Sequence, residues 1–180
     1  MFNIDSLLNK VNFPLGEDTY REPLSILLKD YENHSNFTRL GSLSVQRGLV
    51  KTLESRGRLF QFINNNNLEE PSSPIIVSGL PRSGTTYLFD LLHCSNEFRG
   101  PLTWEIFQMM PIATSRYQQT YKQIKTEAEL ALLKILVPKL NNIHPMKAAL
   151  PEECQLITAL DFRSISFSYS SRVPEYTSFI

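Results

Sequence analysis

Three segments in the first third of the chain carry apolar residues three and four positions apart, as one face of a helix does. These apolar residues are Ile4, Leu7, Leu8 and Val11, then Leu24, Leu27, Leu28 and Tyr31, and then Val45, Leu49, Val50 and Leu53. We predict a helix in each segment, and each helix needs another element to cover its apolar stripe. The third helix also has a charged side, which we interpret as a solvated face. Its charged residues are Arg47, Lys51, Glu54 and Arg56.

The clearest break in this pattern is the polar stretch from Asn64 to Pro74. The short β-branched run Ile75–Val77 follows it, which is typical of a buried parallel strand, and Gly79 ends that run. Residues 85–94 then return to helical spacing. The sequence therefore predicts an α/β fold, with an N-terminal helical region at residues 1–70 and a second region at residues 71–180.

The later part of the chain is again mostly helical in pattern. Apolar spacing predicts a helix over Glu127–Leu140. Pro151 is expected to start another helix, with Glu152 and Glu153 in its first turn, where carboxylates complement the helix dipole. Only one convincing buried strand is found, and one strand cannot make a sheet.

Charge and composition exclude several classes of protein. The 18 basic and 18 acidic side chains cancel, so no long-range field indicates a nucleic-acid-binding or membrane-surface protein. No window approaches the roughly 18 apolar residues of a membrane-spanning helix, and Met1–Val11 lacks the pattern of a signal peptide. We therefore expect a cytoplasmic protein. Cys94 and Cys154 form no Cys-x-x-Cys pair, so we expect reduced core thiols, with neither a zinc site nor a disulfide.

The segment with the most chemical information is Gly79–Thr86, between the predicted strand and the predicted helix. A strand that stops at a glycine and turns into a helix directs several backbone N–H groups to one place, at the positive end of the helix dipole. Such a place binds phosphate. A P-loop nucleotidase, however, needs lysine directly after the second glycine, and Thr85 stands there. The cation lies inside the loop instead, at Arg82.

Residues 74–86, PIIVSGLPRSGTT, resemble the donor loop of the sulfotransferase superfamily, whose members share a P-loop-like α/β fold. The resemblance implies that 3′-phosphoadenosine 5′-phosphosulfate (PAPS) is the sulfate donor. It implies that Arg82 contacts the sulfuryl group, and that Ser83, Gly84, Thr85 and Thr86 cradle the 5′-phosphate. Sulfuryl transfer, like phosphoryl transfer, depends on positioning and on fixed donors, and this account requires no metal.

Transfer also needs a base for the proton of the acceptor. Residues 99–105 resemble the superfamily segment that carries a catalytic Glu, which makes Glu105 the candidate base. A surface or helix-capping role is the alternative for Glu105, and Arg99 could orient the donor, orient Glu105, or form a structural ion pair. His144, in a segment that also resembles this branch, is the second candidate base.

The resemblance runs from about Leu43 to the end and is closest to the bacterial-type branch. In that branch the segment from Pro151 to Tyr176 forms part of the helical cover of the acceptor site, so Tyr169 and Tyr176 could line it or pack in the core. No convincing element for the 3′-phosphate is found, and the later strands are missing. We therefore expect the sheet to be incomplete in this chain, as in a truncated or fragmentary form.

These patterns together predict an enzyme that moves a sulfuryl group from PAPS to a hydroxyl or amine on a small-molecule or carrier-bound acceptor. Nucleic acid and membrane are not expected partners. Two alternatives stay open. One is a P-loop nucleotide kinase or NTPase with a degenerate loop, which Thr85 in place of lysine disfavours. The other is a non-catalytic remnant whose helices serve binding alone.

Overall fold

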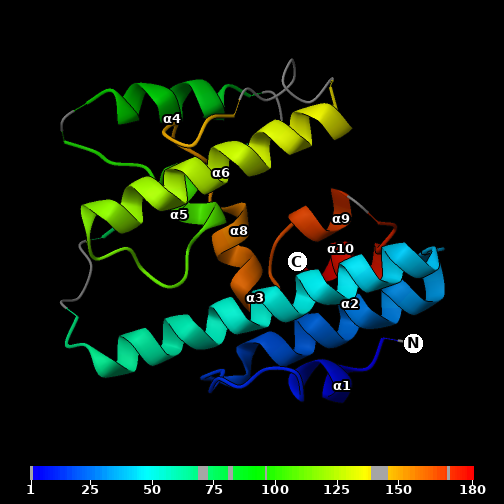
Figure 1. Cartoon of the computed structure of the whole chain (residues 1–180). Coiled ribbons are helices and arrows are strands. Elements are labelled where there is room, and N and C mark those ends of the chain that lie inside the picture. Colours follow the sequence, from blue (N-terminus) through cyan, green and yellow to red (C-terminus); the bar gives the residue numbers. More distant parts are fainter. Residues whose placement is uncertain (1, 69–72, 81–82, 96, 139–145, 170) are drawn as a thin grey trace. The chain divides into compact units, whose positions relative to one another are not determined.

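The computed structural model describes residues 2–68, 73–80, 83–95, 97–138, 146–169 and 171–180. Within these ranges the secondary structure is helical (Figure 1). The chain divides into two compact units, which are described separately. Unit 1 contains Met1–Asn67 and Cys154–Ile180, and unit 2 contains Leu68–Glu153. Our division of the sequence at residues 70 and 71 stays a prediction.

Unit 1 is built from short and long helices, and its three N-terminal helices confirm the predictions from apolar spacing. Its elements are α1 (Ile4–Leu8), the 3-10 turn η1 (Asp18–Tyr20), α2 (Arg21–His34), α3 (Arg39–Asn65), α8 (Gln155–Thr158), the 3-10 turn η2 (Ala159–Asp161), α9 (Ser166–Tyr169) and α10 (Pro174–Phe179). Side-chain caps fix two of the helix starts. Asn3 accepts a hydrogen bond from Ser6 N before α1, and Thr38 accepts one from Gly41 N before α3.

The core of unit 1 joins the N-terminal helices to the last residues of the chain. Its buried apolar residues are Leu7, Tyr20, Leu24, Leu27, Leu28, Tyr31, Leu49, Leu53, Phe162, Val173 and Tyr176. The hydroxyl of Tyr176 donates to Phe162 O at 2.7 Å and accepts from Ser164 N at 3.1 Å. Tyr176 is therefore a core residue, whereas Tyr169 is exposed.

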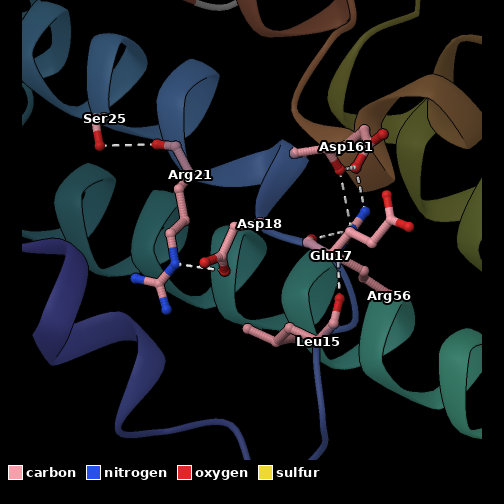
Figure 2. Close-up of polar contacts among 8 residues, drawn as sticks. Leu15, Glu17, Asp18, Arg21, Ser25, Arg56 and Asp161 are labelled. Carbon is pink, nitrogen blue, oxygen red and sulfur yellow. Dashed lines mark hydrogen bonds and ion pairs between the residues drawn. The ribbon is translucent and has the colours of Figure 1, made fainter.

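Arg56 contradicts the prediction of a solvated charged face on α3, because it is only 3% exposed. Its Nε donates to Leu15 O and one Nη2 hydrogen to Glu17 O, both at 2.8 Å, and Nη1 pairs with the carboxylate of Asp161 (Figure 2). The guanidinium also lies 4.9 Å from the centre of the Tyr20 ring. The prediction was wrong because it classified Arg56 by its charge, although its spacing from Leu53 places it on the buried face.

Unit 2 contains α4 (Thr85–His93), α5 (Thr103–Phe107) and α6 (Arg116–Leu136). The predicted helix after the glycine-rich segment is thus confirmed, while α6 begins well before Glu127. The start of α5 is held by the chain near Leu150, because Thr103 N donates to Leu150 O at 2.9 Å and Trp104 N to Ala148 O at 3.1 Å. Pro151 forms an isolated β-bridge with Leu102, so the prediction that it starts a helix was wrong.

The predicted buried strand after Pro74 is also wrong for the described residues. Residues 73–80 are assigned to no strand, and Ile75 and Ile76 are 62% and 79% exposed. A strand exists only with a hydrogen-bonding neighbour, and the described parts of the chain offer this segment none. Within residues 73–80 and 83–86, which are the described parts of this region, neither the strand nor a complete donor loop is therefore seen.

Two further findings concern exposure. Cys94 and Cys154 are free, as expected, but both are exposed, so the prediction of core thiols was wrong. Among the helices of the described residues, none combines the length and the apolar character needed to cross a membrane.

Candidate donor-binding site

The described ends of the predicted donor loop form a tight turn at the start of α4. Gly84 is the N-cap of α4 and has a left-handed backbone with φ of 92°, which glycine adopts without strain. Ser83 N donates to Leu80 O at 3.1 Å. A β-carbon placed on Gly79 would lie 2.7 Å from Ser83 Oγ and 2.9 Å from a methyl group of Thr85. The segment therefore folds back on itself, and Gly79 has no room for a side chain.

The first turn of α4 leaves donors open to solvent. The first N–H groups of a helix have no partner within it, and those of Thr85 and Thr86 find no acceptor in the described part of the chain. The hydroxyl groups of Ser83, Thr85 and Thr86 have no hydrogen-bond partner among the same residues, and Ser83, Gly84 and Thr86 are exposed. Open amides, hydroxyls and the positive end of the helix dipole fit an anion of the size of phosphate.

Two of the predicted site residues, Arg82 and His144, lie outside the described residues. Their roles stay predictions from the sequence. The described site thus consists of the neutral part of the loop, from Ser83 to Thr86, and the segment that carries Glu105.

Glu105 lies in the first turn of α5 with both carboxylate oxygens in use. Oε2 accepts a hydrogen bond from Leu102 N at 2.9 Å, and Oε1 pairs with the guanidinium of Arg99. The side chain is 25% exposed, and its neighbours Trp104 and Ile106 are buried. Of the alternatives drawn from the sequence, the helix-capping contact and the ion pair with Arg99 are both present. Each oxygen keeps a second lone pair that can accept a proton.

The segment with Arg99 and Glu105 is attached to the helix that starts at the loop. Gly100 N donates to Nδ1 of His93, in the last turn of α4, at 3.3 Å. A β-carbon on Gly100 would lie 2.5 Å from the end of the Phe89 ring, so the backbone packs directly on α4. Local patterns in the sequence did not single out His93. Its contact with the main chain of Gly100 is tertiary, and no local pattern encodes it.

The end of α5 is fixed by a buried lysine that the sequence did not single out. Nζ of Lys122, on α6, donates to Gln108 O at 2.6 Å and also to Pro111 O. Burial lowers the pKa of Lys122 because desolvation disfavours the charged form. The Gln108 side chain donates in turn to Glu129 at 2.7 Å. A lysine within a helix that reads as mostly polar gives no signal of burial.

Comparison with known proteins identifies the family to which the chain is related. The model of the sulfotransferase family matches residues 74–180. Sulfotransferase STF1 from Mycobacterium tuberculosis H37Rv has a similar structure, with 25% identity and a TM-score of 0.76, over 99% of this chain and 52% of that one. Sulfotransferase STF9 from Mycobacterium avium matches with 22% identity and a TM-score of 0.73, over 99% of this chain and 48% of that one.

The chain thus spans about half the length of these solved sulfotransferases. None of the curated proteins compared with it matches. The family match covers more than half of the chain and includes the turn at Gly84 and the segment of Glu105. On this evidence the chain belongs to the sulfotransferase family.

Proposed function

We propose that residues 79–86 bind the 5′-phosphosulfate end of PAPS, and that the chain supplies the donor-binding part of an enzyme that sulfates a hydroxyl or amine. The observation that carries this proposal is the left-handed Gly84 at the start of α4, with open amides and hydroxyls directly after it. The family match over residues 74–180 supports PAPS over other phosphate-containing ligands. The acceptor, small or carrier-bound, is left undefined by this argument.

Binding would divide the loop into two parts. The amides and hydroxyls of Thr85 and Thr86 would hold the 5′-phosphate at the N-terminus of α4, where the dipole favours negative charge. Arg82 would supply the positive charge beside the sulfuryl group. Since Thr85 occupies the position of the P-loop lysine, the site lacks the cation that ATP chemistry requires there.

Glu105 would act as the base in this proposal. The bond between sulfur and the bridging oxygen of the 5′-phosphosulfate would break, and 3′-phosphoadenosine 5′-phosphate would leave. The acceptor oxygen or nitrogen would lose its proton as its new bond to sulfur forms. A free lone pair of the Glu105 carboxylate can take that proton. Arg99 and Leu102 N would act as positioning groups, because they hold the two carboxylate oxygens in one orientation. His144 remains the alternative base.

Calorimetric titration of the 180-residue chain with 3′-phosphoadenosine 5′-phosphate, and separately with ATP and magnesium, tests the proposal. We expect preferential binding of the bisphosphate. Gly84→Ala should weaken that binding at least about tenfold, because a β-carbon strains the left-handed turn that starts α4.

Gly48→Ala is the matched control, because Gly48 lies within α3 and a β-carbon there meets no atom within 4 Å. It should leave the affinity unchanged. Preference for ATP with magnesium would favour a degenerate nucleotidase instead. Equal affinity of Gly84→Ala and the unaltered chain would remove the α4 N-terminus from the binding site.

A further inference from the structure

A second group of ligand-type side chains lies in unit 1 and shares no residue with the proposed donor site. It consists of Asp30 and His34 on α2 and Glu175 on α10. One ligand atom from each lies within 4.8 Å of the others. Asp30 and His34 are one helical turn apart, and Nε2 of His34 is 3.7 Å from Oδ1 of Asp30. Two helices that are distant in sequence thus direct a nitrogen and two carboxylates to one place.

The carboxylate of Asp30 supplies an independent reason to expect a ligand. Its side chain is completely buried. Oδ2 accepts a hydrogen bond from Tyr176 N at 2.8 Å, but Oδ1 has no hydrogen-bond partner. The distance from Oδ1 to His34 is too long for a hydrogen bond. A buried carboxylate oxygen without a hydrogen-bond partner is costly, and the imidazole Nε2 of His34 lies 3.7 Å from this one.

We propose that Asp30, His34 and Glu175 bind a zinc ion, with water as the fourth ligand. Zinc bonds of about 2.0–2.2 Å in tetrahedral geometry place ligand atoms about 3.3–3.6 Å apart. The pair of Asp30 and His34 is already close to that separation. The side chains of His34 and Glu175 are 33% and 47% exposed and can rotate to close the remaining gap.

The donor set selects the metal. One imidazole with two carboxylates suits zinc, whereas magnesium and calcium prefer oxygen ligands alone. Nζ of Lys29 lies 3.0 Å from Oε2 of Glu175 and competes with a cation for that carboxylate. The site would tie α10 to α2, which adds to the contact that Asp30 already makes with Tyr176 N.

Titration of the metal-stripped chain with zinc chloride, followed by calorimetry, and with cobalt chloride, followed by visible absorption, tests the site. The variants are made in a Cys94→Ser, Cys154→Ser background, because both thiols are exposed and bind zinc themselves. We expect one zinc per chain and a tetrahedral cobalt spectrum. His34→Gln and Glu175→Gln should each weaken binding at least about tenfold. His93→Gln and Asn33→Ala are the controls and should leave the affinity unchanged.

Lys29→Met gives the sharper test, because it removes the competitor of the cation without touching a ligand. We expect it to raise zinc affinity several-fold. The proposal is overturned if the double serine variant binds no zinc, if His93→Gln abolishes binding while His34→Gln does not, or if Lys29→Met leaves the affinity unchanged. If circular dichroism shows that His34→Gln does not fold, the zinc affinity of Lys29→Met is the test of the proposal. Asp30 is left intact because it also accepts a hydrogen bond from Tyr176 N.

Discussion

Replacement of Arg56 by methionine tests the most heavily bonded polar group in unit 1. The guanidinium donates to two main-chain carbonyls, Leu15 O and Glu17 O, and pairs with Asp161. It also lies over the rings of Tyr20 and Phe60, at 4.9 and 4.6 Å from their centres. Methionine keeps much of the apolar stem but donates no hydrogen bond and carries no charge.

The expected loss follows from these contacts. A buried acceptor left without a donor costs about 1–3 kcal/mol. Since Leu15 is half-buried and Glu17 is exposed, we use the lower part of this range, about 1–1.5 kcal/mol, for each carbonyl. Loss of the two ring contacts adds about 0.5–1 kcal/mol each. The pair with Asp161 adds little, because that carboxylate is 40% exposed and screened by solvent. The free energy of unfolding should fall by about 3–5 kcal/mol.

Urea unfolding followed by circular dichroism at 25 °C measures this loss. A decrease of that size is a large part of the roughly 5–15 kcal/mol that stabilises a typical domain. Arg47→Met is the matched control, because Arg47 lies on the same helix and is exposed. It should change stability by no more than about 0.5 kcal/mol. If Arg56→Met stays within 1 kcal/mol of this control, the hydrogen bonds and ring contacts of Arg56 contribute no net stability and the reasoning is refuted.

Two further predictions concern the site and the core. In a sulfation assay, Glu105→Gln should reduce turnover by a factor of roughly 10²–10⁴, while the affinity for the bisphosphate stays unchanged. If Glu105→Gln keeps full activity and His144→Gln loses it, the base is His144. Burial raises the pKa of Tyr31 to about 12 from 10.0. Between these values the unfolded chain has lost a proton that the folded chain keeps, so stability should fall with rising pH, by up to about 1.4 kcal/mol per unit. Tyr31→Phe should flatten that slope in urea unfolding between pH 9.5 and 11, and an unchanged slope would contradict the assignment.

The helices could be predicted from the sequence because a helix satisfies its hydrogen bonds within one segment. The apolar repeats of α2 and α3, and the return to helical spacing at Thr85, were therefore sufficient. Arg56 shows the limit of this approach. Its position three residues after Leu53 and seven after Leu49 predicts burial, and only the use of charge as a criterion assigned it to the surface.

Contacts between distant segments leave no signal in the sequence comparable to the apolar repeat of a helix. Tyr176 completes a core made mostly by the first helices, and its amide is bound by Asp30, which the sequence separates widely from it. In the candidate site the same is true of His93 and Lys122, whose partners are main-chain groups of other segments. The pair of Arg99 and Glu105 was foreseen as one alternative, because a resemblance to known proteins carries tertiary information that periodicity does not.

The predicted strand and the turn that follows it differ in whether they need a distant segment to form. A run such as Ile75–Val77 becomes a strand only when a second segment pairs with it. Among the described residues it is assigned to no strand, and Ile75 and Ile76 are exposed. The turn at Gly84 needs no such partner. It depends on the left-handed glycine, on the contact of Gly79 with Ser83, and on a helix that begins at Thr85, all within a few residues. We therefore expect phosphate recognition at the start of α4 to depend on Gly84 and not on pairing of the preceding strand.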